Sequence, residues 1–384
     1  MAGVSRARLA RYGEARDAPT DHRRWTQLPR SRRAARRGLR LRGGRPLIRQ
    51  AVVLAGGEGT RLRPLTRTVP KPVVPLAGRP HLAWMLDWLE HHGVREVLLL
   101  CGFLAERVRE HVGDRHGNIQ LSYVVEPEPL DTAGPLRLAL DQGLLAERFF
   151  VLNGDILTDL DLAALERRHR ERSAKATIAV VEVADARSYG SVPIDERGAV
   201  EAFLEKMDDP PTNLVNGGVY LLERTTVASA IAAGRPVSFE REVFPGLVGN
   251  GLYGVAADCY WIDIGTLDRY LEATRDLLAR RPRPPLAVAP GNDPLIAAGA
   301  RVEGSVSAGS VIGAGCVVAT GARVERAVLF DGVRVEAGAA VVDSVVAAGA
   351  RVGAGARVEP GAVVAASPDG SAPAASAATG TAGQ

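Results

Sequence analysis

The chain has 384 residues, of which 46% are hydrophobic and 5% aromatic, enough apolar material for two or three domains. It contains no run of 18 apolar residues, so the sequence predicts no membrane-spanning helix. Its three cysteines, Cys101, Cys259 and Cys316, have neither metal-site nor disulfide spacing, which predicts a reducing, cytoplasmic location. The formal net charge is +4, but residues 1–49 hold 15 arginines against three acidic residues, which leaves −8 for the remainder.

Residues 1–48 repeat arginine without any apolar periodicity, so we predict a disordered arm. An arginine-rich, acid-poor leader is also typical of a mitochondrial transit peptide, but serine is scarce and a long amphipathic repeat is missing. Attraction to nucleic acids or membranes is a third interpretation. We expect an extension without function, and neither a nucleic-acid nor a membrane partner.

The stretch that follows the arm carries the chemistry. Ala51–Leu54 is a short apolar run that predicts a buried parallel strand, and it leads into Gly56-Gly57-Glu58-Gly59-Thr60-Arg61. Three glycines allow backbone N–H groups to converge on an anion, and the arginine adds fixed positive charge. Lys71 stands between two prolines, which hold it on a stiff, extended segment. Together these features predict a cradle for a triphosphate.

Two other glycine-rich motifs fit this stretch less well. A Rossmann fingerprint would need glycine where Leu62 stands, and a P-loop would need Gly-Lys-Ser/Thr at the start of a helix. A glycine-rich turn that merely connects two elements would leave Arg61 and Lys71 unexplained.

Strands and helices alternate from residue 50 to about residue 180. The predicted elements are a helix over 80–92, a strand over 96–100, a helix over 104–112, a strand over 119–125, a helix opened by an N-cap at 131–134, and a strand over 149–152. This alternation predicts a Rossmann-like α/β domain over residues 49–280, with a mainly parallel sheet. Ligands bind at the carboxyl ends of such strands. We therefore expect the glycine-rich loop and Asp155, which both follow strands, to meet in one cleft.

Two aspartates are candidates for holding a divalent metal. Asp155 could be an ordinary turn or capping residue, but a triphosphate needs a cation that one or two carboxylates hold. Asp263 lies in an apolar strand just before a predicted helix over 267–278. An unpaired charge in such a strand is costly, so a metal partner is a natural explanation.

Lysine is rare in this chain. Only Lys71, Lys175 and Lys206 are lysines among 48 basic residues, so these positions are candidates for needing a compact ammonium group. Lys206 follows Glu205 at the end of a strand predicted to begin at Phe203. Lys175 precedes a predicted strand over 177–180, and we expect it to have no role.

A linker over 281–294 is followed by a repeat rich in alanine, glycine and valine. One aliphatic residue recurs every six positions, with a slip of one between series: Val306, Ile312, Val318, Val324; Leu329, Val335, Val341; Val346, Val352, Val358, Val364. Such hexads resemble a left-handed parallel β-helix of about three hexads a turn, here residues 295–366. Low-complexity disorder is the alternative, which the regular spacing disfavours. The flat faces of such a coil predict a homo-oligomer, and residues 367–384 are predicted to be a disordered tail.

The motif G-G-x-G-T-R-L-x-P-L-T-x-x-x-P-K-P-x-x-P at residues 56–75 resembles the signature of sugar-1-phosphate nucleotidyltransferases. The resemblance covers residues 50–365 and implies an enzyme that joins a nucleoside triphosphate to a sugar 1-phosphate with Mg²⁺ and releases pyrophosphate. The segments 70–75 and 128–134 and the terminal hexads are most similar to the mannose-1-phosphate guanylyltransferases of this family. Glucose 1-phosphate with dTTP, UTP or ATP is the alternative.

The resemblance also implies site residues. Those for the nucleotide are Leu54, Ala55, Gly56, Gly57, Gly59, Thr60, Arg61 and Gly134. Those for the sugar phosphate are Gly190, Glu205, Lys206 and Asn216. Those for the metal are Asp155 and Asp263, and the catalytic residues are Arg61, Lys71 and Lys206.

One departure from the family pattern is Asp131, which stands where the family usually has glycine. It either caps the following helix or repels phosphate. A sensor that binds a nucleotide sugar without turnover is therefore a rival, although the metal and phosphate residues are intact. An acyltransferase with its site on the β-helix is a second rival, but all seven histidines precede the linker.

Overall fold

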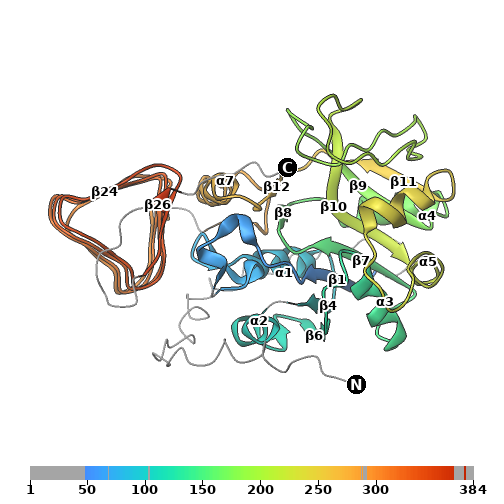
Figure 1. Ribbon diagram of the computed structural model, residues 1–384, viewed down its shortest axis with the longest axis horizontal. Coiled ribbons are helices and arrows are strands. Elements are labelled where there is room, and N and C mark those ends of the chain that lie inside the picture. Colours follow the sequence, from blue (N-terminus) through green and yellow to red (C-terminus); the bar gives the residue numbers. More distant parts are fainter. Residues whose placement is uncertain are drawn as a thin grey trace, which may run out of the picture. The chain divides into compact units, whose positions relative to one another are not determined.

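The computed structural model describes residues 48–67, 69–102, 104–286, 288 and 292–366 and the backbone of Ser376–Ala377 (Figure 1). These residues belong to one compact unit, residues 41–384. The predicted arm, apart from Ile48, and most of the predicted tail lie outside the described residues. Ser376–Ala377 is an exception within the tail, because it forms a short strand, β26, that pairs antiparallel with β25 (Ala362–Val364).

An eight-stranded sheet organises the first part of the chain. Its strand order is β11-β9-β10-β7-β1-β4-β6-β5, and all its strands except β10 and β5 run in the same direction. The strands are β1 (Gln50–Ala55), β4 (Glu96–Cys101), β5 (Arg115–His116), β6 (Ile119–Val125), β7 (Arg148–Asn153), β9 (Ala176–Glu182), β10 (Leu214–Glu223) and β11 (Leu252–Ala256). The prediction of a mainly parallel α/β sheet is confirmed.

Helices cover both faces of this sheet (Figure 1). They are α1 (His81–His91), α2 (Ala105–Val112), α3 (Gly134–Asp141), α4 (Leu162–Glu171), α5 (Arg224–Ala230), α6 (Phe244–Leu247) and α7 (Leu267–Leu278). Successive strand residues point to opposite faces, so Ala51 and Val53 pack with α1, α2 and α7, whereas Val52 packs with α3 and α5. The expected apolar face of α1, formed by Leu82, Leu86 and Leu89, is fully buried.

Short elements complete this part of the chain. The strands β2 (Pro75–Leu76) and β3 (Arg79–Pro80) pair with each other, as do β8 (Ile156–Thr158) and β12 (Trp261–Asp263). Single turns of 3₁₀-helix lie at Thr60–Leu62, Leu65–Arg67 and Lys71–Val73, and a π-helical turn lies at Phe239–Val243.

Two local predictions were wrong. Asp131 does not cap α3: Ala133 is the N-cap residue and makes no side-chain cap, while Asp131 has a φ of 62° and accepts a hydrogen bond from the amide of Thr132. The Thr132 hydroxyl donates a hydrogen bond to Glu240, which holds this loop in place, and the helix begins only at Gly134. The predicted strand at 203–206 is likewise missing, because Leu204 makes just an isolated bridge to Ser191.

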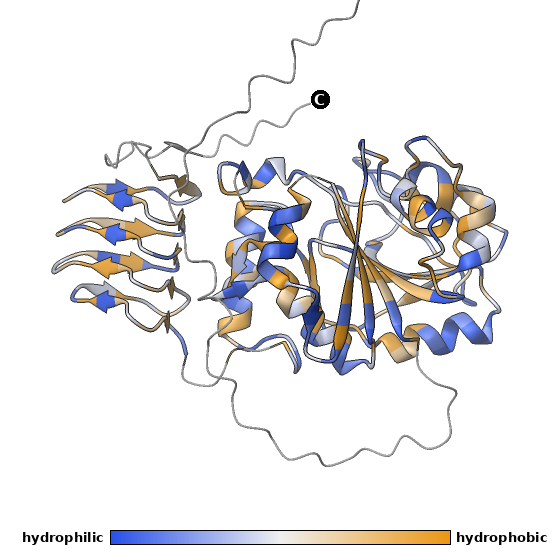
Figure 2. Cartoon of the chain, turned by 90° about the horizontal axis from the view of Figure 1, so that it is seen from below, coloured by the Kyte–Doolittle hydropathy of each residue, from blue (hydrophilic) through white to orange (hydrophobic). Residues whose placement is uncertain are grey.

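The C-terminal repeat forms the expected left-handed parallel β-helix, with a triangular cross-section (Figure 1) and stacked coils (Figure 2). Its three faces are the ladders β13-β16-β19-β22-β25, β14-β17-β20-β23 and β15-β18-β21-β24. The strands are β13 (Leu295–Ile296), β14 (Arg301–Val302), β15 (Ser305–Val306), β16 (Val311–Ile312), β17 (Val317–Val318), β18 (Arg323–Glu325), β19 (Val328–Leu329), β20 (Arg334–Val335), β21 (Ala340–Val342), β22 (Val345–Val346), β23 (Arg351–Val352), β24 (Arg357–Val358) and β25.

The slip in the six-residue spacing has a structural cause. Ile312 pairs with Leu329 and Leu329 with Val346, so each of these coils advances by 17 residues rather than three full hexads. The aliphatic residues that mark the repeat form one buried stack, with Val306 half-buried at its start. Among the described residues, no helix is long and apolar enough to cross a membrane.

Candidate active site

A cavity of about 460 Å³ opens at the carboxyl ends of β1 and β7. The predicted site residues that line it are Leu54, Ala55, Gly56, Gly57, Gly59, Thr60, Arg61, Lys71 and Asp155. The structure therefore brings the glycine-rich loop and the strand-end carboxylate together in one cleft. Other lining residues include Glu126, Asp131, Thr132, Asn153 and Gly265.

Close contacts explain two of the glycines in the loop. A Cβ on Gly56 would lie 2.5 Å from Oε1 of Glu126, so no larger residue fits there without moving that carboxylate. Gly59 has a φ of 61°, and a Cβ there would lie 3.1 Å from Cβ of Lys71. Glycine thus keeps the loop close to Lys71 and leaves its backbone open to the cavity.

Lys71 and Asp155 form the central ion pair of the cavity. Nζ of Lys71 lies 2.6 Å from Oδ2 of Asp155, and the two side chains are 12% and 28% exposed. Burial alone would raise the pKa of Asp155, but the charge and hydrogen bond of Lys71, helped by the more distant Arg61, outweigh it. The pKa of Asp155 therefore lies below its usual value, and the group is an ionised carboxylate at neutral pH.

Asp263 lies next to Asp155, although the two residues are far apart in the sequence. Strand β12 pairs with β8, so Asp263 stands opposite Ile156, directly beside Asp155. Its Oδ1 accepts a hydrogen bond of 3.0 Å from the amide of Gly265. A Cβ on Gly265 would lie 2.9 Å from Nη2 of Arg61 and 3.0 Å from Oδ1 of Asp263, so this glycine leaves room for both side chains.

These two carboxylates fit a divalent metal that is shared with a substrate. Nowhere in the described part of the chain do three or more His, Cys, Asp or Glu side chains gather as a metal site of their own. Magnesium in phosphoryl chemistry is commonly held by one or two carboxylates, while phosphates and water complete its shell. Asp155 and Asp263 are oxygen donors of that kind: Asp155 directly precedes β8, and Asp263 ends the neighbouring strand β12.

His81 supports the segment that carries Asp155. Its fully buried ring places Nε2 3.0 Å from the carbonyl oxygen of Ile156, the residue after Asp155. Burial lowers the pKa of His81 to about 4, so the ring is neutral and its Nε2–H donates a hydrogen bond to that carbonyl.

Glu126 is a cavity residue that our sequence analysis missed. It follows strand β6 directly, so the strand-end rule that pointed to Asp155 could have found it. Oε2 accepts a hydrogen bond of 2.9 Å from the amide of Leu130, which fixes the side chain, and burial raises the pKa of Glu126. Asn153, the last residue of β7, is a second missed residue in the lining.

The residues predicted for the sugar phosphate are only partly brought together. The backbone amide of Asn216 donates a hydrogen bond of 3.0 Å to the carbonyl of Gly190, and the side-chain amide of Asn216 donates one of 2.9 Å to the Tyr220 hydroxyl. Glu205 and Lys206, however, are exposed and do not line the cavity.

Gly134 does not line the cavity either, although the next residue, Pro135, does. A Cβ on Gly134 would lie 2.7 Å from Cβ of Leu130, so the structure supplies a packing reason for this glycine.

Comparison with known proteins decides the family. The Nucleotidyl transferase family model matches residues 50–280, more than half of the chain. The chain belongs to the nucleotidyl transferase family. Residues 292–369 of this nucleotidyl transferase match a second model, described as GMPPB C-terminal domain.

This nucleotidyl transferase is also similar to individual proteins. It is 40% identical to the mannose-1-phosphate guanylyltransferase of Mycobacterium tuberculosis, across 75% of this chain and 81% of that protein. It is 32% identical to a UTP–glucose-1-phosphate uridylyltransferase of Synechocystis, across 74% of this chain and 84% of that protein. Among solved structures, HddC from Yersinia pseudotuberculosis complexed with GMP-PN is 29% identical, with a TM-score of 0.52 across 60% of this chain and all of that one.

Proposed function

We propose that this nucleotidyl transferase joins GTP to mannose 1-phosphate and releases pyrophosphate, forming GDP-mannose. The observation that carries the proposal is the single cavity in which the glycine-rich loop, Lys71 and Asp155 meet, with Asp263 beside it. The name of the mycobacterial relative supports the choice of base and sugar.

The residues of the cavity have separate parts in this reaction. A phosphate oxygen of the sugar phosphate attacks the α-phosphorus of GTP in line, the bond to the β-phosphate oxygen breaks, and pyrophosphate leaves. The backbone of residues 56–60 cradles the triphosphate, while Arg61 and Lys71 neutralise charge on it. Asp155 and Asp263 would hold Mg²⁺, which when bound neutralises phosphate charge.

Glu126 supports guanine as the base. The Watson–Crick edge of guanine presents two neighbouring donors, N1–H and N2–H₂, which one carboxylate can accept together. Uracil and thymine present one N–H between two carbonyl oxygens, and a carboxylate repels those oxygens. Glu126 lines the cavity, and its side chain is held in place by the amide of Leu130.

The remaining parts of the proposal rest on sequence patterns. Gly190, Glu205, Lys206 and Asn216 are proposed to bind the sugar phosphate, with Glu205 and Lys206 approaching it from their exposed loop. We further propose a homo-oligomer that assembles through flat faces of the β-helix. A cytoplasmic location is part of the proposal, supported by the free thiols of the three cysteines.

The test is a matrix of substrates with the full-length enzyme. GTP, UTP, dTTP and ATP are each combined with mannose 1-phosphate or glucose 1-phosphate and Mg²⁺, and pyrophosphate release is measured. We expect the highest kcat/KM for GTP with mannose 1-phosphate. Preferential use of UTP or dTTP with glucose 1-phosphate would establish the alternative, and the absence of pyrophosphate with every pair would favour the non-catalytic sensor.

A variant tests the assignment of the base. Glu126→Gln keeps an oxygen for the Leu130 amide but replaces one acceptor with a donor. Because a hydrogen bond to a charged group contributes about 1.5–3 kcal/mol, we expect kcat/KM for GTP to fall by roughly 10- to 100-fold relative to UTP. The matched control is Glu128→Gln, two residues away and exposed, which should preserve the preference. An unchanged preference in Glu126→Gln would remove this residue from base recognition.

A further inference from the structure

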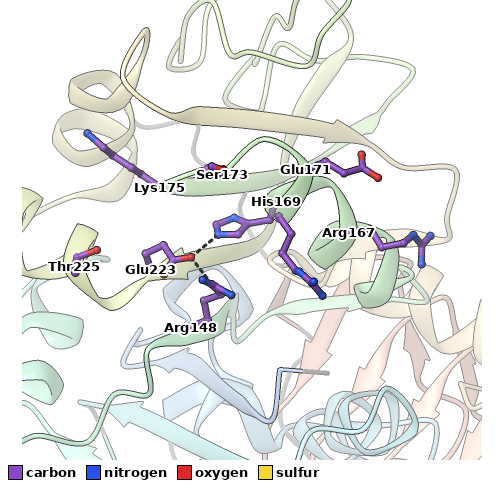
Figure 3. A pocket seen from close by; sticks show the side chains of 10 residues that line it. Arg148, Arg167, His169, Glu171, Ser173, Lys175, Glu223 and Thr225 are labelled. Carbon is purple, nitrogen blue, oxygen red and sulfur yellow. Dashed lines mark hydrogen bonds and ion pairs between the residues drawn. The ribbon is translucent and has the colours of Figure 1, made fainter. Parts of the chain in front are cut away.

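A second cavity, of about 980 Å³, lies at the opposite end of strand β7 from the nucleotide cavity. Arg148 begins β7 and lines this second cavity, whereas Asn153 ends β7 and lines the first. Figure 3 shows the second cavity, which lies among β7, the end of α4, the start of β9 and the end of β10. The two cavities share no lining residue.

Positive charge dominates the lining of the second cavity. Arg148, Arg167, Arg170 and Lys175 line it together with two carboxylates, those of Glu171 and Glu223. Two carboxylates outside the lining, Asp161 and Glu166, lie 3.8 Å from Arg167 and 3.9 Å from Arg170. The chain beyond the arginine-rich arm carries a net charge of −8, so this local excess is not a consequence of general composition. A concave surface with such an excess attracts anions.

A partly buried network fixes the position of one of these cations. Glu223 accepts a hydrogen bond from Nε of Arg148, and its Oε1 lies 3.2 Å from Nε2 of His169 (Figure 3). Nδ1 of His169 lies 2.8 Å from the hydroxyl of Thr177, and both of these residues are almost fully buried. Burial lowers the pKa of His169, although Glu223 opposes this, so the neutral ring can donate to Glu223 and accept from Thr177. The guanidinium of Arg148 is thereby held at the cavity wall before any ligand arrives.

Lys175 gives an independent reason to assign a function to this cavity. It is one of three lysines in the chain, and the nucleotide cavity does not use it. Nζ donates to Oδ1 of Asn250 at 2.7 Å, and a Cβ on Gly251 would lie 3.0 Å from Cγ of Lys175. The narrow lysine stem therefore packs against a glycine, and Lys175 contributes to a cavity lining although our sequence analysis expected no role for it.

A simpler explanation covers part of this cluster. Arg167 and Arg170 lie toward the end of α4, where basic side chains complement the helix dipole. That explanation does not extend to Arg148 and Lys175, which come from other elements of the fold. Cations from two separate segments, the start of β7 and residues 167–175, line one concavity.

We propose that this second cavity binds a phosphorylated small anion, independently of the substrates at the nucleotide cavity. Arginine and lysine recognise phosphate oxygens through charge-assisted hydrogen bonds, and a cavity of this volume can hold a phosphorylated metabolite. The proposal does not depend on which nucleotide or sugar the enzyme uses.

The test compares two double variants, in and directly after α4, in the full-length protein. Arg167→Gln with Arg170→Gln removes two lining charges, and both side chains are exposed, so the fold should tolerate the changes. Arg168→Gln with Arg172→Gln removes two exposed charges from the same stretch that do not line the cavity. The probe is inorganic phosphate in calorimetric titrations. The nucleotide cavity is intact in both variants, so any phosphate it binds is common to both.

We expect the lining variant to weaken phosphate binding by about tenfold or more and the control variant to change it by less than about twofold. Lys175→Gln should also weaken it. Tungstate, a heavy phosphate mimic, should appear in crystals against Arg148 and Lys175. Pyrophosphate release without added phosphate should be normal in all variants, which verifies that they are folded. Equal phosphate affinities of the two double variants, or tungstate bound in the nucleotide cavity alone, would overturn the proposal.

Discussion

Asp131 and Arg241 form an ion pair at the nucleotide cavity, and removing one partner should have a different effect from removing the other. Asp131 lines the cavity at the position where the family usually has glycine, and its Oδ2 is paired with Arg241 from the π-helical turn. The aspartate side chain is 28% exposed and the arginine 65%. We predict that Asp131→Gly alone is nearly silent, because Arg241 already neutralises the carboxylate. Arg241→Ala should be harmful, because it leaves that charge facing the triphosphate.

The expected effect on stability is small for Asp131→Gly. Glycine relieves the left-handed backbone at a φ of 62°, a gain of about 1 kcal/mol. The variant loses an exposed ion pair, worth about 0–1 kcal/mol, and the hydrogen bond to the Thr132 amide, worth about 1 kcal/mol. These contributions nearly cancel, so the free energy of unfolding should change by no more than about 1 kcal/mol.

The expected effect of Arg241→Ala on GTP use is larger. Like unit charges roughly 8 Å apart at an effective dielectric constant of about 20 repel by about 2 kcal/mol, and salt reduces this further. A remaining penalty of about 1–2 kcal/mol corresponds to a fall of roughly 5- to 30-fold in kcat/KM for GTP.

The assay is steady-state pyrophosphate release with GTP varied, in the wild type, both single variants and the double variant. If the ion pair protects the cavity from Asp131, the double variant should recover close to wild-type kcat/KM, because the exposed carboxylate is gone. Equal impairment of Arg241→Ala and the double variant would refute the reasoning, since Arg241 would then act without Asp131. A large gain in Asp131→Gly alone would show that Arg241 does not neutralise the charge.

Three further predictions concern the metal, the lysines and the β-helix. Asp155→Asn and Asp263→Asn should each lower Mg²⁺-dependent kcat by roughly 10²- to 10³-fold, and near-normal turnover in both would exclude the metal assignment. Lys71→Arg should mainly lower kcat/KM for GTP, and Lys206→Arg should mainly lower kcat/KM for the sugar phosphate, because the longer, planar guanidinium misplaces the charge. Steady-state kinetics in which each substrate is varied in turn would test this. Equal effects of the two variants on both substrates would show that the lysines have no separate roles. Deleting residues 291–384 should lower the melting temperature, because the β-helix shares an apolar core with the rest of the chain. It should also change the assembly size measured by light scattering, and both effects should exceed the change in kcat. An equally stable protein of unchanged assembly state would contradict this.

The fold could be predicted well where one physical pattern dominated. The helix over 267–278 and the strand over 119–125 were predicted with the bounds that the structure has, because each has clear apolar periodicity and clear ends. The aliphatic spacing of the β-helix predicted its core because each buried position repeats a contact of the previous coil. The strand expected at 203–206 failed because Leu204 makes a single bridge, and nothing in its local sequence reveals that the ladder stops there.

The site could be predicted where its residues follow strands. The positions of Lys71 and Asp155 follow from the strand-end rule and a recognisable motif, and their side chains meet at 2.6 Å. Asp263 was predicted from its charge in an apolar strand and from the family resemblance, but its position beside Asp155 had no local signal. The pairing of β12 with β8, which brings Asp263 beside Asp155, depends on residues more than 100 positions apart. Local patterns carry no information on such a pairing.

Asp131, which replaces the glycine usual in the family, shows how a distant partner can change the interpretation of a motif. Taken alone, a carboxylate in a phosphate cavity indicates a lost activity, which is why Asp131 gave the non-catalytic sensor its support. The structure adds Arg241, 110 positions further along the chain, as the counter-charge. With that partner the cavity gains no net charge from the two side chains, and the strongest sequence argument for the sensor loses its physical basis. The presence of an unusual residue in a motif is therefore interpretable only together with the side chain that faces it.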